Sequence, residues 1–477
     1  MSQHLWSGRF DAAPDPAAFD FGISFSFDRR LFEDDVAGSL AWAQALHEAG
    51  VLDDADAAAI RDGLTAILEQ GRRDPAWVNG PDEDIHSFVE RQLVARIGDA
   101  GRRLHTGRSR NEQVSLDLRL YLRRRVPRLQ AGLRAVIAAL ADQAAAAGDA
   151  LMPSYTHLRR AMPVLVSHYL LSHAAALRRD HDRLAQAREE ANALPLGSGA
   201  IAGTGYAVDT DRLAARLGFD RVVANSMDAS SDRDFAATFL YATAVAMVHL
   251  SRLAEDVILF TSEEFGFFEL SDRSATGSSM MPQKKNPDPL ELVRGKSGRA
   301  IGHLTGLLVT MKGLPTGYNK DLQEDKEPLF DAEDTLAVST AAAASVVSQL
   351  TLRPAVTARA ASGLLLATDV ADYLVSKGMP FRQAHEVVGA MVRQLLADGR
   401  DIEALSLSEW QAFSPLFAED VKARVTAAAS VRARRTPQST HPDAVQARLD
   451  ELRTWLAARA DPGPTAPSCN RSRLPGV

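Results

Sequence analysis

Hydroxyl, ammonium and amide side chains share one short segment, GSSMMPQKKNPDPLELVRGKSGR, which starts at Gly277. Its glycine and serines favour a mobile loop, and Lys284 and Asn286 stand just before a predicted helix with prolines in its first turn. A helix N-terminus carries partial positive charge, to which the lysines add full charges. The segment therefore predicts an anion site beside a flexible serine loop. The alternative is a solvated basic loop without function.

The distribution of lysine supports chemistry in this region. The chain has eight lysines, so 46 of its 54 basic residues are arginines. The first 283 residues contain no lysine, and six of the eight lie between Lys284 and Lys326. An ammonium group is a compact, titratable point charge that a guanidinium does not replace. A composition bias with chance clustering is the alternative explanation.

A second candidate binding segment is LHTGRSRNEQV, from Leu104 to Val114. Arg110 can grip a carboxylate through two parallel hydrogen bonds, and Ser109 and Asn111 could orient it. Asn111 is also an N-cap type of residue, so a capped helix with surface arginines is the alternative.

A candidate proton donor or acceptor lies in MPSYTHLRRAMP, where Thr156 and His157 are predicted to occupy a short turn between two helices. Histidine is the side chain most easily tuned to exchange a proton near pH 7. A lone histidine is more often structural, so its value depends on a partner, for which Glu291 is a candidate.

Other patterns carry less weight. The run GSGAIAG (197–203) resembles a dinucleotide loop only superficially, because no βαβ unit surrounds it. His168 and His173 are five residues apart, no HExxH motif occurs, and the single cysteine, Cys469, lies in a Pro/Ser-rich tail. We therefore expect no metal site, no cofactor and no catalytic thiol.

Long helices must position these segments. Alternating β-branched runs are scarce, and Ala, Leu, Arg and Glu dominate stretches without Gly or Pro, so the chain is predicted to be nearly all α. Five long helices are expected, over about 111–148, 163–192, 231–264, 288–311 and 329–352, and helices of this length indicate a bundle. The stretches AATFLYATAVAMVHL and TLAVSTAAAASVVSQL are apolar nearly all round, which predicts self-association.

Composition limits the partners and the compartment. With 46% hydrophobic and 24% charged residues, the sequence is typical of a soluble globular protein. The net charge of −7 gives no basic field for nucleic acid or an anionic membrane. The N-terminus lacks the pattern of a secretory signal and no stretch is long enough to span a membrane, so we expect a cytoplasmic protein.

Taken together, GSSMMPQKKNPD, LHTGRSRNEQV, MPSYTHLRRAMP, NSMDASSDRDF and ATDVADYLVSKGMPFRQAHEVVG resemble the argininosuccinate lyase family of the fumarase/aspartase superfamily. The resemblance extends from about Trp6 to about Leu456. It implies an all-α fold of three domains, with a central five-helix bundle that forms a twenty-helix core in a homotetramer whose active sites are shared between subunits. The expected boundaries are 1–108 for an N-terminal mixed loop and helix domain, 109–358 for the bundle, 359–460 for a small C-terminal helical domain and 461–477 for a flexible tail.

The resemblance implies reversible cleavage of argininosuccinate to arginine and fumarate, without a cofactor. Ser278 matches the family's base, and His157, oriented by Glu291 and assisted by Thr156, matches the acid; the assignment with the two roles exchanged stays open. Lys284 and Asn286 match the groups that stabilise the carboxylate dianion. The expected substrate-binding residues are Ser24, Ser109, Arg110, Asn111, Tyr318, Gln323 and Lys326, the last three holding the arginine half.

The sequence also departs from the family pattern. Ser154, Arg159 and Met162 stand at positions that are commonly Gly, Gln and Gln, and Glu112 replaces a frequent Asp. None of these changes removes a proposed catalytic group. The alternatives are another fumarate-releasing lyase of the superfamily and a non-catalytic structural relative.

Overall fold

The computed structural model describes residues 15–459, and it divides into two compact units. Unit 1 comprises residues 1–131, 180–247 and 296–337, and unit 2 comprises residues 132–179, 248–295 and 338–477. Cys469 and the predicted tail lie outside the described residues. The domain boundaries predicted from the sequence stay a prediction.

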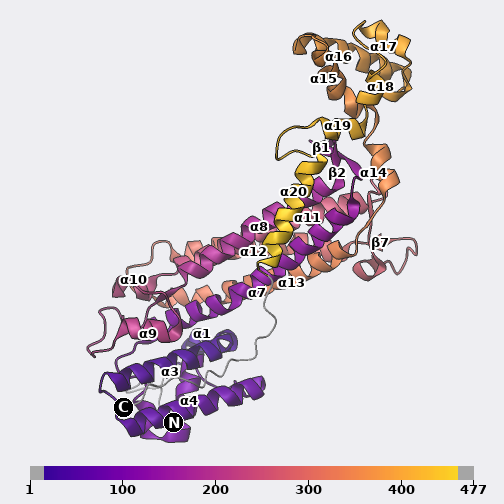
Figure 1. The fold of residues 1–477 in the computed structure, drawn as a ribbon. Coiled ribbons are helices and arrows are strands. Elements are labelled where there is room, and N and C mark those ends of the chain that lie inside the picture. Colours follow the sequence, from indigo (N-terminus) through magenta and orange to yellow (C-terminus); the bar gives the residue numbers. More distant parts are fainter. Residues whose placement is uncertain (1–14, 460–477) are drawn as a thin grey trace. The chain divides into compact units, whose positions relative to one another are not determined.

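Five long helices run through both units (Figure 1). They are α7 (Arg110–Ala147), α8 (Val166–Glu190), α11 (Asp234–Thr261), α12 (Asp288–Met311) and α13 (Lys326–Ser348). The five predicted helices are confirmed, with boundaries that differ by a few residues. Each unit thus contains one part of every long helix, and the remaining elements are local to one unit.

In unit 1 most of the other helices precede α7, and α9 and α10 lie between α8 and α11. These other helices are α1 (Pro16–Gly22), α2 (Phe25–Asp28), α3 (Phe32–Glu48), α4 (Asp54–Arg73), α5 (Ile85–Ile97), α6 (Asp99–Arg102), α9 (Thr210–Leu217) and α10 (Ser226–Ser231), with a short parallel pair of strands, β3 (Ala193–Leu194) and β4 (Arg221–Val222). Asp53 and Asp84 cap α4 and α5 through their side chains. Such caps satisfy backbone N–H groups that a helix leaves unpaired, so they define where these helices begin.

In unit 2 the extra elements are hairpins and a set of short helices. The strands are β1 (Leu151–Thr156) with β2 (Arg159–Leu165), β5 (Phe268–Glu269) with β8 (Thr351–Leu352), and β6 (Thr276–Gly277) with β7 (Lys285–Asn286), all antiparallel. The helices are α14 (Pro354–Ala360), α15 (Ala367–Ser376), α16 (Phe381–Asp398), α17 (Leu407–Phe413), α18 (Val421–Arg424), α19 (Ala427–Ala433) and α20 (Pro442–Ala457).

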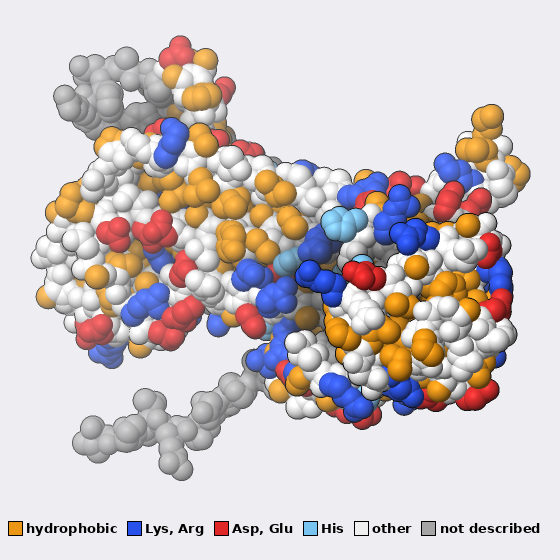
Figure 2. Space-filling model, turned by 90° about the horizontal axis from the view of Figure 1, so that it is seen from above, with side chains coloured by type: hydrophobic (Ala, Val, Ile, Leu, Met, Phe, Trp, Pro, Cys, Tyr) orange, Lys and Arg blue, Asp and Glu red, His pale blue; other side chains and the backbone are white. Residues whose placement is uncertain are grey.

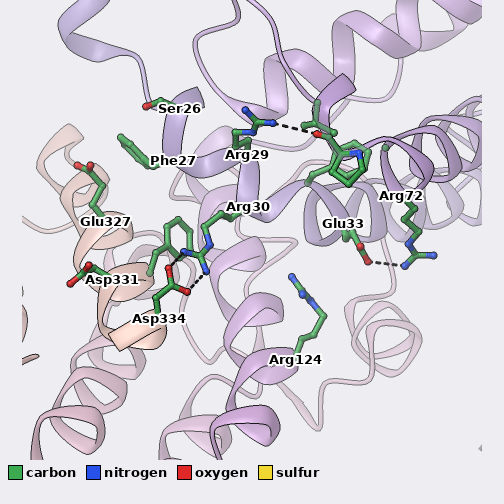
Figure 3. A pocket seen from close by; sticks show the side chains of 15 residues that line it. Ser26, Phe27, Arg29, Arg30, Glu33, Arg72, Arg124, Glu327, Asp331 and Asp334 are labelled. Atoms are coloured by element: carbon green, nitrogen blue, oxygen red, sulfur yellow. Dashed lines mark hydrogen bonds and ion pairs between the residues drawn. The ribbon is translucent and has the colours of Figure 1, made fainter. Parts of the chain in front are cut away.

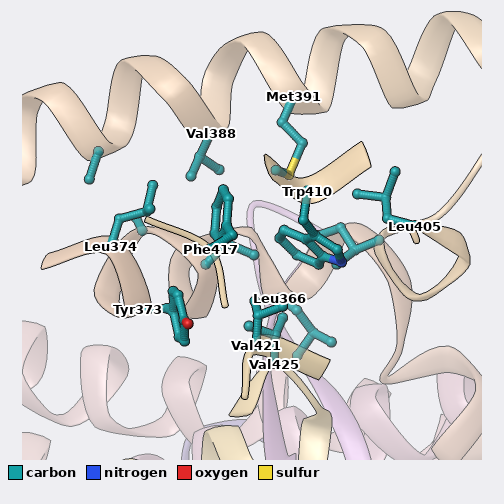
Figure 4. Close-up of a cluster of buried hydrophobic side chains, with 14 of the residues drawn as sticks. Leu366, Tyr373, Leu374, Val388, Met391, Leu405, Trp410, Phe417, Val421 and Val425 are labelled. Carbon is teal, nitrogen blue, oxygen red and sulfur yellow. The ribbon is translucent and has the colours of Figure 1, made fainter. Parts of the chain in front are cut away.

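The residues after α14 form their own hydrophobic cluster (Figure 4). The rings of Trp410 and Phe417 lie 4.8 Å apart, and Tyr373 stacks on Phe417 at 5.7 Å. The Tyr373 hydroxyl donates to Asp420 at 2.5 Å, so the polar end of this buried ring is satisfied. This region therefore has a core that does not depend on the long helices.

Candidate active site

The serine loop predicted from the sequence is closed at its base by a hairpin whose two strands, β6 and β7, have two residues each. Thr276 pairs with Asn286 and Gly277 pairs with Lys285, which leaves residues 278–284 as the loop. The Thr276 hydroxyl donates to the carboxylate of Asp288, the first residue of α12, at 2.5 Å. This bond ties the base of the loop to the start of the helix.

Ser278 is positioned by its own loop. Its Oγ accepts hydrogen bonds from the backbone N–H groups of Met281, at 3.0 Å, and Met280, at 3.3 Å. Two amide donors aimed at one hydroxyl oxygen favour negative charge on that oxygen. The geometry therefore supports an ionisable role for this serine.

The two lysines of the loop differ in what they contact. Lys285 pairs with Asp272 at 2.7 Å and donates to the carbonyl of Leu270, so a carboxylate that precedes the hairpin already pairs with its charge. Lys284 is exposed, and among residues 15–459 no hydrogen bond or ion pair holds its ammonium group. Lys284, rather than Lys285, is available to a ligand.

His157 lies at the tip of the β1–β2 hairpin. The prediction of a simple turn between two helices was wrong, because residues 151–165 pair as antiparallel strands and α8 begins only at Val166. Pro163, predicted to open that helix, lies in β2 opposite Pro153. A two-stranded ribbon tolerates proline, since N–H groups on its outer side need no partner strand.

The hairpin tip has an unusual backbone. His157 and Leu158 both have φ of 55°, the left-handed conformation of a two-residue type I′ turn. Asparagine and glycine usually occupy such turns, whereas leucine pays steric strain there. Both side chains are exposed, so the turn presents His157 outward from the hairpin.

Two of the departures from the family pattern meet within this hairpin. The Ser154 hydroxyl donates to the Met162 carbonyl at 2.8 Å and accepts from the Met162 N–H at 3.2 Å, where the strand register shifts. The side chain of Ser154 thus replaces a ladder contact at the irregularity.

Glu291 is exposed in the first turn of α12. No hydrogen bond between His157 and Glu291 occurs within the described chain. The predicted orientation of the histidine by this carboxylate stays a prediction.

The second candidate segment caps α7. The Ser109 Oγ accepts from the Asn111 N–H at 3.3 Å, while the Glu112 carboxylate accepts from the Ser109 N–H at 3.0 Å. Ser109 is therefore the N-cap of α7, two residues before the cap predicted at Asn111. This arrangement resembles a capping box, with serine followed three residues later by glutamate.

Arg110 is held from several sides. Its guanidinium lies 3.4 Å from the Asp84 carboxylate and donates to Gln113 at 3.1 Å and to Ser87 at 3.4 Å. Burial alone would raise the pKa of Asp84, but Arg110, His86 and the hydrogen bonds from Ser87 outweigh it and lower that pKa to about 2. Arg110 is thus a fixed cation.

Ser24 lies beside the same 83–87 segment. Its N–H donates to the Glu83 carbonyl at 2.9 Å, and its hydroxyl donates to Asp28 at 2.5 Å. Asp28 also accepts from the Ile85 N–H at 3.0 Å. Burial raises the pKa of Asp28 to about 6, although the charge of His86 and the Ser24 bond oppose this.

The predicted arginine-half residues continue this neighbourhood. Gln323 donates to the Gly22 carbonyl at 3.3 Å, two residues before Ser24. Tyr318 is half-buried, and burial raises its pKa. Lys326 is 3% exposed and bonds to Asp325 at 2.9 Å, whose other oxygen accepts from the buried Arg233. Lys326 is therefore a buried, paired cation.

Unit 1 thus contains Ser24, Ser109, Arg110, Asn111, Tyr318, Gln323 and Lys326, and unit 2 contains Thr156, His157, Ser278, Lys284, Asn286 and Glu291. Sequence reasoning missed Asp28, Asp84 and the Asp325–Arg233 pair. Asp84 could have been found, because an N-cap type residue before an apolar helix start is a readable signal.

Three buried residues of metal-ligating type also meet in unit 1: Asp35, His86 and Asp117. The His86 Nδ1 lies 2.7 Å from Asp35 and 3.3 Å from Asp117, and Gln113 donates to the same Asp35 oxygen at 2.5 Å. Burial, and next the charge of Asp35, raise the pKa of Asp117 well above its usual value. These contacts form a buried ionic cluster around His86.

A cavity of about 700 Å³ opens elsewhere in unit 1, and Figure 3 shows its charged lining. Arg30 bonds to Asp334 at 2.7 and 2.8 Å, and Arg72 bonds to Glu33 at 2.8 Å. None of the candidate site residues lines it. Since three of its arginines, Arg30, Arg72 and Arg124, are already paired with acids, we do not assign the reaction to this cavity.

Comparisons with known proteins agree on one family. The sequence model of the family described as "Lyase" matches residues 8–302, and that of "Argininosuccinate lyase C-terminal" matches residues 364–432. The argininosuccinate lyase of Thiobacillus denitrificans is 50% identical over 455 residues, covering 95% of this chain and 98% of the relative. That of Moorella thermoacetica is 48% identical over 460 residues, with the same coverage.

Solved structures share the fold. An EDDS lyase in complex with formate aligns with a TM-score of 0.82 at 29% identity, covering 94% of this chain and 93% of the other. A fumarate lyase from Mesorhizobium sp. BNC1 aligns with a TM-score of 0.71 at 20% identity, covering 91% and 97%, which shows the fold alone. With these matches over nearly its whole length, the chain belongs to the argininosuccinate lyase family of the fumarase/aspartase superfamily.

Proposed function

We propose that this protein is an argininosuccinate lyase, which cleaves argininosuccinate reversibly to L-arginine and fumarate in arginine biosynthesis. Family membership supports the proposal. The observation that carries it is the 278–284 loop, where two backbone N–H groups donate to the Ser278 hydroxyl and Lys284 and Asn286 lie on the returning limb.

The reaction begins with loss of a proton from the carbon next to a carboxylate. The Ser278 alkoxide takes this proton, and the carboxylate becomes a dianion. Lys284 and Asn286 stabilise the added charge, because preorganised donors act most strongly where charge develops. A serine hydroxyl is a weak acid, so the alkoxide also needs the positive charge of a closed, water-poor site.

The carbon–nitrogen bond then breaks as the carbon–carbon double bond of fumarate forms. The departing guanidino nitrogen receives a proton from His157, assisted by Thr156 and oriented by Glu291. His157 lies on an exposed turn, where it can approach a ligand without moving a packed element.

The unit 1 residues bind the rest of the substrate. Ser109, Arg110 and Asn111 hold a carboxylate at the start of α7, where the helix N-terminus adds partial positive charge. Tyr318, Gln323 and Lys326 hold the arginine half, with Ser24 as a further contact. In this assignment Lys326 acts through a buried pair rather than as a free cation.

The working form is a homotetramer with shared active sites. Exposed apolar side chains on three long helices support this proposal: Tyr241 and Val248 on α11, Ile301, Leu308 and Val309 on α12, and Val338 on α13. On the face drawn in Figure 2, hydrophobic side chains form continuous areas. Covering such surface stabilises an oligomer.

We further propose that the protein works in the cytoplasm and acts on a small molecule rather than nucleic acid, because its net charge of −7 gives no basic field. No helix of the described residues is long and apolar enough to cross a membrane.

The decisive experiment offers argininosuccinate, malate, aspartate and adenylosuccinate separately and follows the absorbance of fumarate. Release from argininosuccinate alone is the expected result. Release from another substrate would assign a sister activity, and no release from any would favour a non-catalytic relative.

A further inference from the structure

The glycine-rich loop 197–203 packs on residues 109–111, the candidate carboxylate-binding segment. Glu112 joins the two. Its Oε2 accepts from the N–H groups of Gly197, at 2.8 Å, and Gly199, at 3.0 Å, while its Oε1 accepts from Ser109. The residue is fully buried, and all of its hydrogen-bond partners among the described residues are these backbone N–H groups.

The loop in turn holds Asn111. The Asn111 side-chain amide donates to the Ala200 carbonyl at 3.1 Å. This bond fixes which way the amide group points, and it leaves the Asn111 carbonyl oxygen for another partner.

The loop also contacts the turn before Tyr318. A Cβ atom at Gly317, whose φ is +97°, would lie 2.7 Å from the Ile201 side chain, so this side chain packs directly on the Gly317 backbone. The 197–203 loop therefore touches both segments assigned to substrate binding in unit 1.

We propose that Glu112 is a positioning residue that clamps the 197–203 loop, and that the clamped loop sets the orientation of Asn111 and of the turn carrying Tyr318 for substrate binding. The inference rests on the proposed function for its substrate. Glu112 itself touches no reacting atom; it acts through the loop.

Glu112→Gln is a sharp probe because the side chain keeps its size. A glutamine must present its NH2 group to at least one of the three N–H donors, so at least one hydrogen bond is lost. The matched control is Glu409→Gln, which alters the same position of the capping box at the start of α17.

Two measurements are needed. We expect Glu112→Gln to raise KM for argininosuccinate about tenfold with kcat within about twofold. This pattern is expected when the ground state and the transition state lose the same binding energy. Hydrogen exchange of the 197–203 backbone should accelerate about tenfold in the same variant, without any need for turnover. Glu409→Gln should change neither.

A second variant tests the loop if Glu112→Gln does not fold. Gly199 has φ of +59°, and an added Cβ would meet the Gly203 carbonyl oxygen at 2.6 Å, whereas Gly205 has open space. Gly199→Ala should therefore reproduce the rise in KM, and Gly205→Ala should not.

Unchanged exchange in Glu112→Gln would overturn the clamp, and faster exchange with unchanged KM would overturn its role in binding. A wild-type protein that releases no fumarate would instead refute the proposed function, and the exchange measurement would still test the clamp.

Discussion

At the scale of single residues, the lysines show that a shared charge does not mean a shared role. Lys285 pairs with Asp272, Lys326 is buried against Asp325, and the Lys284 ammonium group makes no hydrogen bond or ion pair among the described residues. A buried pair fixes a position, whereas an unpaired exposed ammonium can bind an incoming anion. The lysine-rich region is therefore one catalytic candidate with neighbours that build the site.

Loss of Ser278 or His157 should remove proton transfer. We expect Ser278→Ala and His157→Asn each to lower kcat at least about a hundredfold, the usual contribution of a general acid or base. Fumarate release under saturating argininosuccinate measures this. Ser279→Ala is the matched control within the same loop and should keep most activity; near-normal rates in either test variant would remove that residue from the mechanism.

The raised pKa of Asp28 predicts how stability depends on pH. The unfolded carboxyl ionises near its usual pKa of 3.8, but burial holds the folded group neutral up to about pH 6. The stabilisation that neutral Asp28 contributes is therefore complete below about pH 4 and is lost as the pH rises through 6. The loss amounts to about 3 kcal/mol, because the pKa of the folded carboxyl is higher than that of the unfolded one by about two.

Asp28→Asn should lack this loss. Between pH 4 and pH 7 the free energy of unfolding, measured in urea, should fall for the wild type by more than it falls for the variant. Parallel curves for the two proteins would show that Asp28 is ionised in the folded state.

At the scale of elements, the β1–β2 hairpin combines backbone strain with a functional side chain. Its tip uses His157 and Leu158 where glycine or asparagine would cost less. Strain at such a position persists only when the surrounding structure holds it. Here the Thr440 hydroxyl oxygen accepts a hydrogen bond from the Leu165 N–H at 2.8 Å, which anchors β2.

Leu158→Gly should relieve the strain. Leu158 is 77% exposed, so its removal forfeits little packing, and glycine adopts positive φ without penalty. We expect the free energy of unfolding to rise by up to ~1 kcal/mol. Leu396→Gly, two residues before the end of α16, should instead lower it, by up to about 1 kcal/mol. A destabilised Leu158→Gly protein would contradict the strain argument.

At the scale of the whole molecule, the candidate residues fall into two groups assigned to different compact units. Three of the long helices that run through both units, α11, α12 and α13, expose apolar side chains. A shared site in a tetramer would combine groups from different chains and would cover these side chains in the same assembly.

Mixed assemblies test this sharing. Ser278→Ala and Asn111→Ala each remove a proposed site residue, so each variant should be strongly impaired alone. The two residues lie in different units. After joint dissociation and reassembly, part of the wild-type fumarate release should return, because some sites then contain neither substitution. Each variant reassembled by itself is the control, and tetramers without recovery at any mixing ratio would contradict shared sites.

The sequence by itself determined the five long helices, since their composition, caps and prolines are local signals. It also determined the candidate residues, because their types and spacing are written in the chain. It could not determine the β1–β2 hairpin, whose strands are stabilised by pairing rather than by intrinsic preference.

Only the tertiary structure decided which charges are free and which are paired. Asp84 and Arg110 are 26 residues apart in sequence order, and Glu112 meets Gly197 across 85 residues. A local sequence pattern does not predict hydrogen bonds of this kind, because they join residues that become neighbours only when the chain folds. The Glu112 clamp and the pairing of Lys285 became visible for that reason.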